Sequence, residues 1–183
     1  AGGFGREIKF LIDNINKIEK QFNIIGFVDD NLEKGQIING IEVIGNLNTL
    51  LEIKKPISVV LGIGDPVVKK KIIAEIGNSD FIFPNLIHPN VIIGNDDVSL
   101  GVGTVICAGN IITCNIKIKN FVTLNLSCTV GHDTIINDFA SFMPSVNISG
   151  EVLINECVYV GTGAKIINQL EIGENSIVGA GAV

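Results

Sequence analysis

The sequence predicts a small α/β domain at the N-terminus, followed by an all-β parallel β-helix built from hexapeptide repeats. Three observations lead to this fold class. Large apolar residues recur at every sixth position from Leu100 to Val178 without a slip. The preceding half of the chain alternates strand-like and amphipathic segments, which is typical of β-α-β units. With 183 residues, the chain is long enough for two small domains.

The β-helix prediction depends on the period of six. The apolar residues of the run are Leu100, Ile106, Ile112, Ile118, Leu124, Val130, Ile136, Phe142, Ile148, Ile154, Val160, Ile166, Ile172 and Val178. Because 46% of all residues are apolar, such a run in a preset phase has a chance of roughly one in fifty thousand. A helix repeats about every 3.6 residues and a strand about every 2, so neither explains the period. A parallel β-helix does, with one short strand and one turn in each hexad.

Two neighbouring columns of the repeat support the same fold. The residue after each apolar one is mostly small or turn-prone, as in Gly101, Asn125 and Gly131, and we expect it to adopt left-handed backbone angles. The residue four positions after the apolar one is mostly small or β-branched, which suits a narrow interior. Three hexads close one triangular coil, so residues eighteen apart stack about 4.8 Å from one another. One inner column therefore consists of Leu100, Ile118, Ile136, Ile154 and Ile172.

The N-terminal domain begins with a glycine cluster that predicts a strand-to-helix turn. An amphipathic helix follows, and its apolar stripe consists of Ile8, Leu11, Ile12, Ile15, Ile18 and Phe22. The N–H groups of such a turn and the positive end of the helix dipole favour binding of a phosphate. The alternative is a tight turn that binds no ligand. The strand that should precede the turn is missing from the sequence. Because Ala1 is not a start methionine and Val183 ends inside a hexad, we expect both natural ends to lie outside the sequence.

The next segments continue the β-α-β order. A strand over residues 24–28 ends in Asp29-Asp30, where a mononucleotide-binding fold meets a ribose or base, with a solvated turn as the alternative. Residues 47–55 predict a helix and residues 57–61 a buried strand. A helix over residues 67–76 is capped by Asp65, and its three consecutive lysines, Lys69, Lys70 and Lys71, are expected to face water.

The order of these elements predicts a parallel sheet with one mononucleotide-binding half, since the segment is too short for a full dinucleotide-binding domain. We assign residues 1–84 to this domain and residues 85–183 to the β-helix, which opens at Ile87-His88-Pro89.

Composition excludes several classes of function. A net charge of −6 without a basic stripe argues against nucleic-acid binding. No apolar run reaches the length of a membrane span, and there is no signal-peptide pattern. The four cysteines form no C-x-x-C pair, so we expect small apolar residues in a reducing, cytoplasmic setting. Two histidines cannot supply the three that a zinc-dependent β-helix enzyme needs, so no metal is expected.

His132, in Gly131-His132-Asp133, is the main catalytic candidate. Histidine is the usual general base near neutral pH, and a carboxylate beside it can fix the tautomer. Asp133 is adjacent in sequence and Asp138 is a second candidate partner, while a surface histidine without a role is the alternative. His88, between Ile87 and Pro89, is expected to have a structural or incidental role.

Taken together and in order, these motifs resemble the bacterial sugar O- and N-acetyltransferases of the sialic-acid and bacillosamine pathways. The motifs are the glycine cluster, the Gly-Phe-Val-Asp-Asp and Leu-Gly-Ile-Gly strand ends, the Ile-His-Pro junction, the hexads and the Gly-His-Asp turn. The resemblance covers essentially the whole chain. It implies a left-handed β-helix, a homotrimer, and a cytoplasmic acyltransferase of surface-glycan biosynthesis. Acetyl-CoA would be the cosubstrate, and the acceptor a sugar or nucleotide-linked amino sugar.

The resemblance also implies roles for individual residues. His132 matches the general base, Asp133 the acidic residue after it, and Asn125 an asparagine near the reacting centre. The residues implied in substrate binding are Gly2, Gly3, Phe4, Gly5, Asp29, Asp30, Ile63 and Gly64. Those implied along the acetyl-CoA groove are Ser149, Gly150, Gly161, Thr162, Gly163 and Gly179. Ser141 stands where some members of the family have a second histidine.

We expect direct acetyl transfer without an acetyl-enzyme, because no serine or cysteine is clearly paired with His132. The choice between N- and O-acetylation and the identity of the sugar stay open. The alternatives are a sialic-acid O-acetyltransferase and a non-catalytic β-helix used for assembly. A serine acetyltransferase disagrees with the α/β domain, and a nicotinamide-dependent enzyme disagrees with the short length of that domain.

Overall fold

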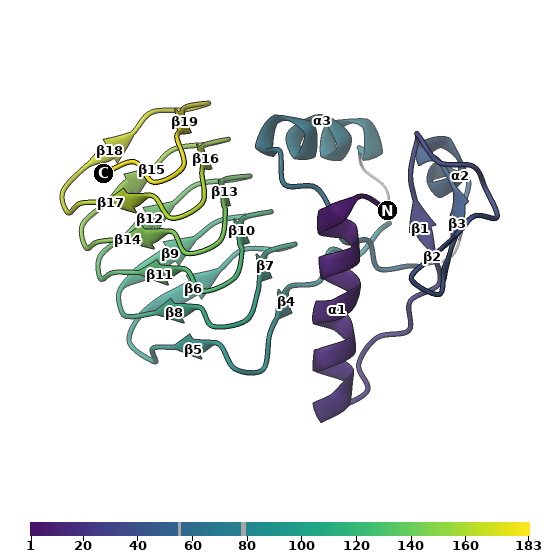
Figure 1. Ribbon diagram of the computed structural model, residues 1–183, viewed down its shortest axis with the longest axis horizontal. Coiled ribbons are helices and arrows are strands. Elements are labelled where there is room, and N and C mark those ends of the chain that lie inside the picture. Colours follow the sequence, from purple (N-terminus) through teal and green to yellow (C-terminus); the bar gives the residue numbers. More distant parts are fainter. Residues whose placement is uncertain (55, 78–79) are drawn as a thin grey trace.

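The computed structural model describes residues 1–54, 56–77 and 80–183. In Figure 1, a stack of triangular coils rises beside an N-terminal region of helices and short strands. The predicted fold class is confirmed: a short α/β region precedes a left-handed parallel β-helix. Its division at residues 84 and 85 stays a prediction.

In its described residues, the N-terminal region contains three helices and one small sheet. Its elements are α1 (Gly3–Ile18), β1 (Phe27–Val28), β2 (Ile37–Ile38), β3 (Ile41–Gly45), α2 (Leu47–Leu51) and α3 (Pro66–Ile76). Strand β3 lies in the centre, parallel to β1 and antiparallel to β2. The apolar stripe of α1 buries Ile8, Leu11, Ile12 and Ile15 against the start of the β-helix.

Several features of this region differ from the predictions. The helix predicted over residues 47–55 ends at Leu51, and Lys55 lies outside the described residues. Segment 57–61 forms only one bridge, Ser58 with Ile82, so it is not a regular strand. The sheet is therefore not a row of parallel strands. The β2–β3 hairpin was not predicted, although Asn39-Gly40, both at positive φ, is a strong hairpin signal.

The β-helix consists of three parallel sheets, one along each side of the triangle. The first sheet contains β4 (Leu86–Ile87), β7 (Val105–Ile106), β10 (Thr123–Leu124), β13 (Ser141–Phe142), β16 (Tyr159–Val160) and β19 (Ile177–Val178). The second contains β5 (Ile92–Ile93), β8 (Ile111–Ile112), β11 (Thr129–Val130), β14 (Asn147–Ile148) and β17 (Lys165–Ile166). The third contains β6 (Val98–Leu100), β9 (Ile116–Ile118), β12 (Ile135–Ile136), β15 (Leu153–Ile154) and β18 (Glu171–Ile172).

The strand register confirms the inner columns. In the third sheet, Ile136 pairs with Ile118 below and Ile154 above, each eighteen residues away. These residues are buried, as are the small residues expected to fill the interior, such as Val122 and Ala140. An aliphatic stack with period six therefore forms the core.

The left-handed positions lie elsewhere in the hexad than predicted. Positive φ occurs three residues after the apolar one, as at Asp133, and not at the position directly after it. At Gly131, directly after the apolar Val130, a small residue is needed because adjacent coils approach closely there. A Cβ on Gly131 would lie 2.6 Å from the Gly150 backbone nitrogen.

Helix α3 lies against the first sheet and joins the two parts of the chain (Figure 1). Lys69, expected to face water, is 1% exposed. Its Nζ donates hydrogen bonds to Phe121 O at 2.7 Å, Thr123 Oγ1 at 3.1 Å and Ala140 O at 3.4 Å. The prediction failed because a lysine buried by contacts distant in sequence has the same local pattern as one in solvent.

In the described part of the chain, no helix combines the length and apolar character needed to cross a bilayer.

Candidate functional site

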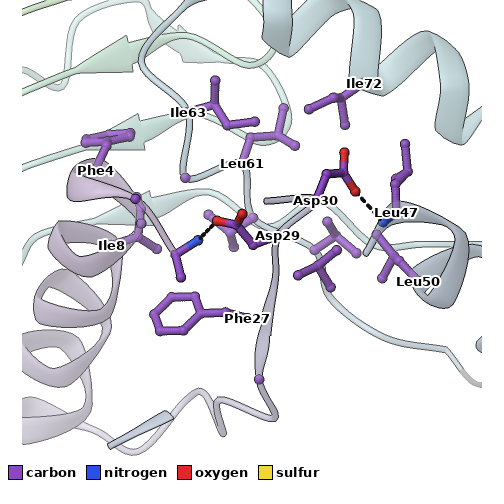
Figure 2. Close-up of a pocket in the computed structure, with 18 of the residues that line it drawn as sticks. Phe4, Ile8, Phe27, Asp29, Asp30, Leu47, Leu50, Leu61, Ile63 and Ile72 are labelled. Atoms are coloured by element: carbon purple, nitrogen blue, oxygen red, sulfur yellow. Dashed lines mark hydrogen bonds and ion pairs between the residues drawn. The ribbon is translucent and has the colours of Figure 1, made fainter. Parts of the chain in front are cut away.

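A cavity of about 600 Å³ lies in the N-terminal region, within the range of about 300–1,000 Å³ usual for small-molecule sites. Its walls come from the start of α1, the end of β1, α2, segment 57–64 and α3 (Figure 2). All eight residues that the resemblance implied in substrate binding line it: Gly2, Gly3, Phe4, Gly5, Asp29, Asp30, Ile63 and Gly64. The structure thus brings together segments that are up to about sixty residues apart in sequence.

Among the described residues, no side chain caps the backbone N–H groups at the start of α1. The N-cap residue of α1 is Gly2, which offers no capping side chain. Segment 61–64 crosses the first turn so closely that a Cβ on Gly62 would lie 2.7 Å from Gly5 Cα. The N-terminus of a 16-residue helix therefore opens into the cavity, an arrangement that favours an anionic group.

The two aspartates at the end of β1 differ in their contacts. The Asp29 carboxylate accepts hydrogen bonds from the Ala1 nitrogen and the Asn31 N–H. The Asp30 carboxylate accepts the Leu47 N–H at 3.0 Å and so holds the start of α2. Figure 2 shows both carboxylates at the cavity wall.

No lysine or arginine belongs to the described residues that line the cavity. A phosphate there would meet backbone N–H groups and the helix dipole, with Asp29 and Asp30 left for donor groups of the ligand such as hydroxyls.

His132 lies elsewhere, at the turn between the second and third sheets, which we call the His132 corner (residues 131–134 and the equivalent turns above and below). Its Nδ1 lies 2.7 Å from Asp133 Oδ2, so Asp133, not Asp138, is its partner. The Asp138 carboxylate instead accepts the Asn120 N–H at 2.7 Å. An ionised carboxylate only accepts hydrogen bonds, so Nδ1 carries a proton. In the neutral imidazole, Nε2 then offers a lone pair, as a general base requires.

Asp133 is held from a second side. Asn115, one coil below, donates from Nδ2 to Asp133 Oδ1 at 3.0 Å. Hydrogen bonds from His132 and then Asn115 lower the pKa of Asp133, so it is ionised at neutral pH. Sequence reasoning missed Asn115, although its position eighteen residues before Asp133 was available as a signal.

The coil above supplies a surface against which the imidazole lies. A Cβ on Gly150 would lie 2.5 Å from His132 Nε2 and 2.6 Å from Cε1. Position 150 therefore needs a glycine to make room for the imidazole ring. This structural reason is separate from the role in acetyl-CoA binding that the resemblance implied. The neighbouring Ser149 carbonyl accepts a hydrogen bond from Thr134 Oγ1 at 3.2 Å.

Asn125 is not at this corner. It lies at the turn between the first and second sheets. Asn125 precedes His132 by seven residues, slightly more than one hexad, and each hexad forms one side of the triangle. Asn125 is 5% exposed, and its Oδ1 accepts the Leu126 N–H at 2.7 Å. The implied acetyl-CoA residues divide in the same way: Ser149 and Gly150 lie at the His132 corner, and Gly161, Thr162, Gly163 and Gly179 lie at the Asn125 corner.

Other polar groups do not join either site. Ser141 is fully buried, and its Oγ has no partner among the described residues. His88 Nδ1 accepts the Asn90 N–H at 3.2 Å, in a local turn. All four cysteines are free, and burial raises the pKa of Cys107 to about 12 and of Cys128 to about 11. Within residues 1–54, 56–77 and 80–183, no group of three or more His, Cys, Asp or Glu residues could hold a metal ion.

Comparison with known proteins gives a consistent family. Residues 1–76 match the PglD N-terminal domain family. The chain is 32% identical over 185 residues to GDP-perosamine N-acetyltransferase of Escherichia coli O157:H7, covering 99% of this chain and 81% of that protein.

Two solved structures share the whole architecture. The acetyltransferase domain of PglB from Neisseria gonorrhoeae FA1090, in complex with acetyl coenzyme A, matches with a TM-score of 0.84 and 29% identity. That match covers 100% of this chain and 86% of the other. PerB from Caulobacter crescentus, in complex with CoA and GDP-perosamine, matches with a TM-score of 0.84 and 26% identity. It covers 98% of this chain and 83% of that one.

Proposed function

The chain belongs to the bacterial sugar acetyltransferase family, and we propose that it transfers the acetyl group of acetyl-CoA to the amino group of a nucleotide-linked amino sugar. The observation that carries the proposal is the cavity at the start of α1, whose backbone N–H groups suit a diphosphate. The names of the relatives support an amino acceptor and a nucleotide-linked sugar. They favour N-acetylation over the alternative of a sialic-acid O-acetyltransferase.

In the proposed mechanism, His132 Nε2 removes a proton from the sugar amine as the nitrogen attacks the thioester carbonyl. The new N–C bond forms, the C–S bond breaks, and the proton passes to the departing thiolate of CoA. Asp133 keeps the Nδ1 proton in place and stabilises the imidazolium. Positioning of the two substrates supplies much of the rate, and a backbone N–H at a turn of the β-helix would stabilise the oxyanion.

The transfer is direct in this proposal. Formation of an acetyl-enzyme needs a nucleophile within hydrogen-bond reach of a base. Among the described residues, the only side chain hydrogen-bonded to the His132 imidazole is that of Asp133. The raised pKa values of Cys107 and Cys128 keep these thiols protonated at neutral pH.

The proposal includes a homotrimer with a shared active site. The cavity that would hold the nucleotide sugar is not lined by His132, Asp133 or Asn125. A reaction that needs both the sugar and the base therefore fits a site completed by a neighbouring copy. If each copy contributes its cavity to one neighbour and its His132 to the other, the contacts are head-to-tail and close into a ring. A ring of three copies suits the triangular cross-section of the β-helix. A monomer at micromolar concentration in sedimentation would contradict this arrangement.

We also propose a cytoplasmic location, because four free cysteines suit a reducing compartment.

Ligand-dependent thermal stability tests the substrate class. A ligand at one hundred times its dissociation constant stabilises the folded state by about 2.7 kcal/mol. We expect acetyl-CoA and one of GDP or UDP to raise the melting temperature, and Gly62→Ala to remove the nucleotide response only. A response to CMP-sialic acid without GDP or UDP would favour the O-acetyltransferase. No response to acetyl-CoA would contradict the proposal.

A further inference from the structure

One side-chain contact near the proposed base comes from a residue that no motif identified. Asp133 has two carboxylate oxygens, each with a separate partner. Oδ2 meets His132 Nδ1 at 2.7 Å, and Oδ1 accepts from Asn115 Nδ2 at 3.0 Å. The three side chains form a row that runs across two successive coils at the His132 corner.

The backbone alone does not explain an asparagine at position 115. Asn115 has a φ of 54°, and asparagine tolerates this region well. However, equivalent positions of other hexads have the same backbone with Phe121, Ser127 or Cys157, so this fold accepts many residue types there. The side-chain contact, rather than the backbone angle, distinguishes Asn115.

The direction of the contact follows from the chemistry of the groups. Ionised Asp133 only accepts hydrogen bonds, so Asn115 must turn its NH₂ toward Oδ1. The side chains of His132 and Asp133 are 56% and 49% exposed in the single chain. Water therefore competes for Asp133, and a second donor restricts the rotation of its carboxylate.

We propose that Asn115 is a positioning residue for acetyl transfer: its amide orients Asp133 so that Oδ2 holds the Nδ1–H tautomer of His132 and Nε2 is kept free as the base. This inference rests on the proposed role of His132 in the reaction. Asn115 acts only through Asp133 and does not touch the reacting groups.

Exchange of donor and acceptor between positions 115 and 133 gives a sharp test. In Asp133→Asn alone, Asn115 can present either its NH₂ or its oxygen, so His132 takes both tautomers. In the double variant Asn115→Asp/Asp133→Asn, the carboxylate at 115 accepts only. The amide at 133 must then turn its NH₂ downward and its oxygen toward His132, which restores the Nδ1–H tautomer.

The readout is the ¹⁵N chemical shifts of the imidazole nitrogens at about pH 8.5, where histidine is mostly neutral. The chain has two histidines, and His88 is an internal reference. Its Nδ1 accepts the Asn90 N–H, so it carries its proton on Nε2, opposite to His132. The control variant is Asn137→Ala, which removes a similar amide contact, Asn137 Nδ2 to Asn155 Oδ1 at 3.3 Å, at a different corner.

We expect a higher Nδ1–H fraction in the double variant than in Asp133→Asn, a lower fraction in Asn115→Gly than in wild type, and wild-type spectra in Asn137→Ala. Loss of one hydrogen bond should lower kcat/KM of Asn115→Gly roughly two- to tenfold. The inference would be overturned if the double variant had the same Nδ1–H fraction as Asp133→Asn and Asn115→Gly the same fraction as wild type. It would also be overturned if Asn137→Ala changed the spectra as much as Asn115→Gly. The spectra need no substrate, so they decide the role of Asn115 even if the wild-type protein transfers no acetyl group.

Discussion

The buried amine of Lys69 predicts an unusual dependence of stability on pH. Lys69 lies between α3 and the first sheet and is 1% exposed. Burial lowers its pKa from 10.5 to about 7, although Cys157 and Asp65 nearby oppose the shift. Between these two values, the unfolded chain binds a proton that the folded chain does not. The free energy of unfolding contributed by this group therefore rises as pH rises from about 7 to 10.5, and is constant below about 7.

The magnitude follows from the size of the shift. Each unit of pKa corresponds to about 1.4 kcal/mol, so the full effect is about 5 kcal/mol, of which about 3 kcal/mol falls between about pH 7 and pH 9.5. Lys69→Met removes the titration. It also leaves Phe121 O without the Lys69 donor, a cost of about 1–3 kcal/mol that does not vary with pH.

The assay is urea unfolding of wild type and Lys69→Met over this pH range at one protein concentration, since oligomer stability depends on concentration. The matched control is Lys71→Met, on the same helix, with a side chain that is 75% exposed. We expect the difference between wild type and Lys69→Met to grow with pH, and the difference for Lys71→Met to stay flat. A flat difference for Lys69→Met would refute the low pKa and the buried position from which it follows.

Three further substitutions test the site and the core. Gly150→Ala should lower kcat/KM by at least tenfold, because the added Cβ would lie 2.5 Å from His132 Nε2 and displace the ring; an unchanged rate in a steady-state assay would contradict the position of the imidazole. Gly62→Ala should raise KM for the nucleotide sugar without weakening acetyl-CoA binding by calorimetry, because the Cβ would lie 2.7 Å from Gly5 Cα at the start of α1; equal loss of both ligands would argue against a separate sugar pocket. Phe142→Ala should lower the free energy of unfolding by about 3–5 kcal/mol in urea, because Phe142 is fully buried in the β-helix; a loss below about 1 kcal/mol would contradict a close-packed core.

The repeat could be predicted from sequence because it is local and regular. Every apolar residue from Ile106 to Ile166 at period six is buried, since each hexad repeats the same strand and turn. The left-handed position could not be assigned from composition alone. Glycine suits both a positive φ and a close approach of adjacent coils. At Gly131 only the structure shows that the reason is the close approach, because its φ is not positive.

The site was predictable only in part. The glycine cluster and Asp29-Asp30 indicated the cavity, because helix starts and strand ends are the usual ligand-binding positions of α/β folds. Lys69 and Asn115 were missed because their partners are distant: Phe121 lies 52 residues from Lys69, and Asp133 lies 18 residues from Asn115. Asn125 and His132 are only seven residues apart, yet they lie at different corners, since the coil turns by one side in each hexad.

Turnover of His132→Ala tests the central claim most directly. Wild type and variant would be given acetyl-CoA and a GDP- or UDP-linked amino sugar, with product detected by mass spectrometry and the acetylated atom identified by NMR. The control is His88→Ala, which removes the other histidine. We predict N-acetylation by wild type and His88→Ala, and a loss of about 10²–10⁴ in kcat for His132→Ala while acetyl-CoA still raises the melting temperature. Near-normal turnover by His132→Ala would contradict its role as the base.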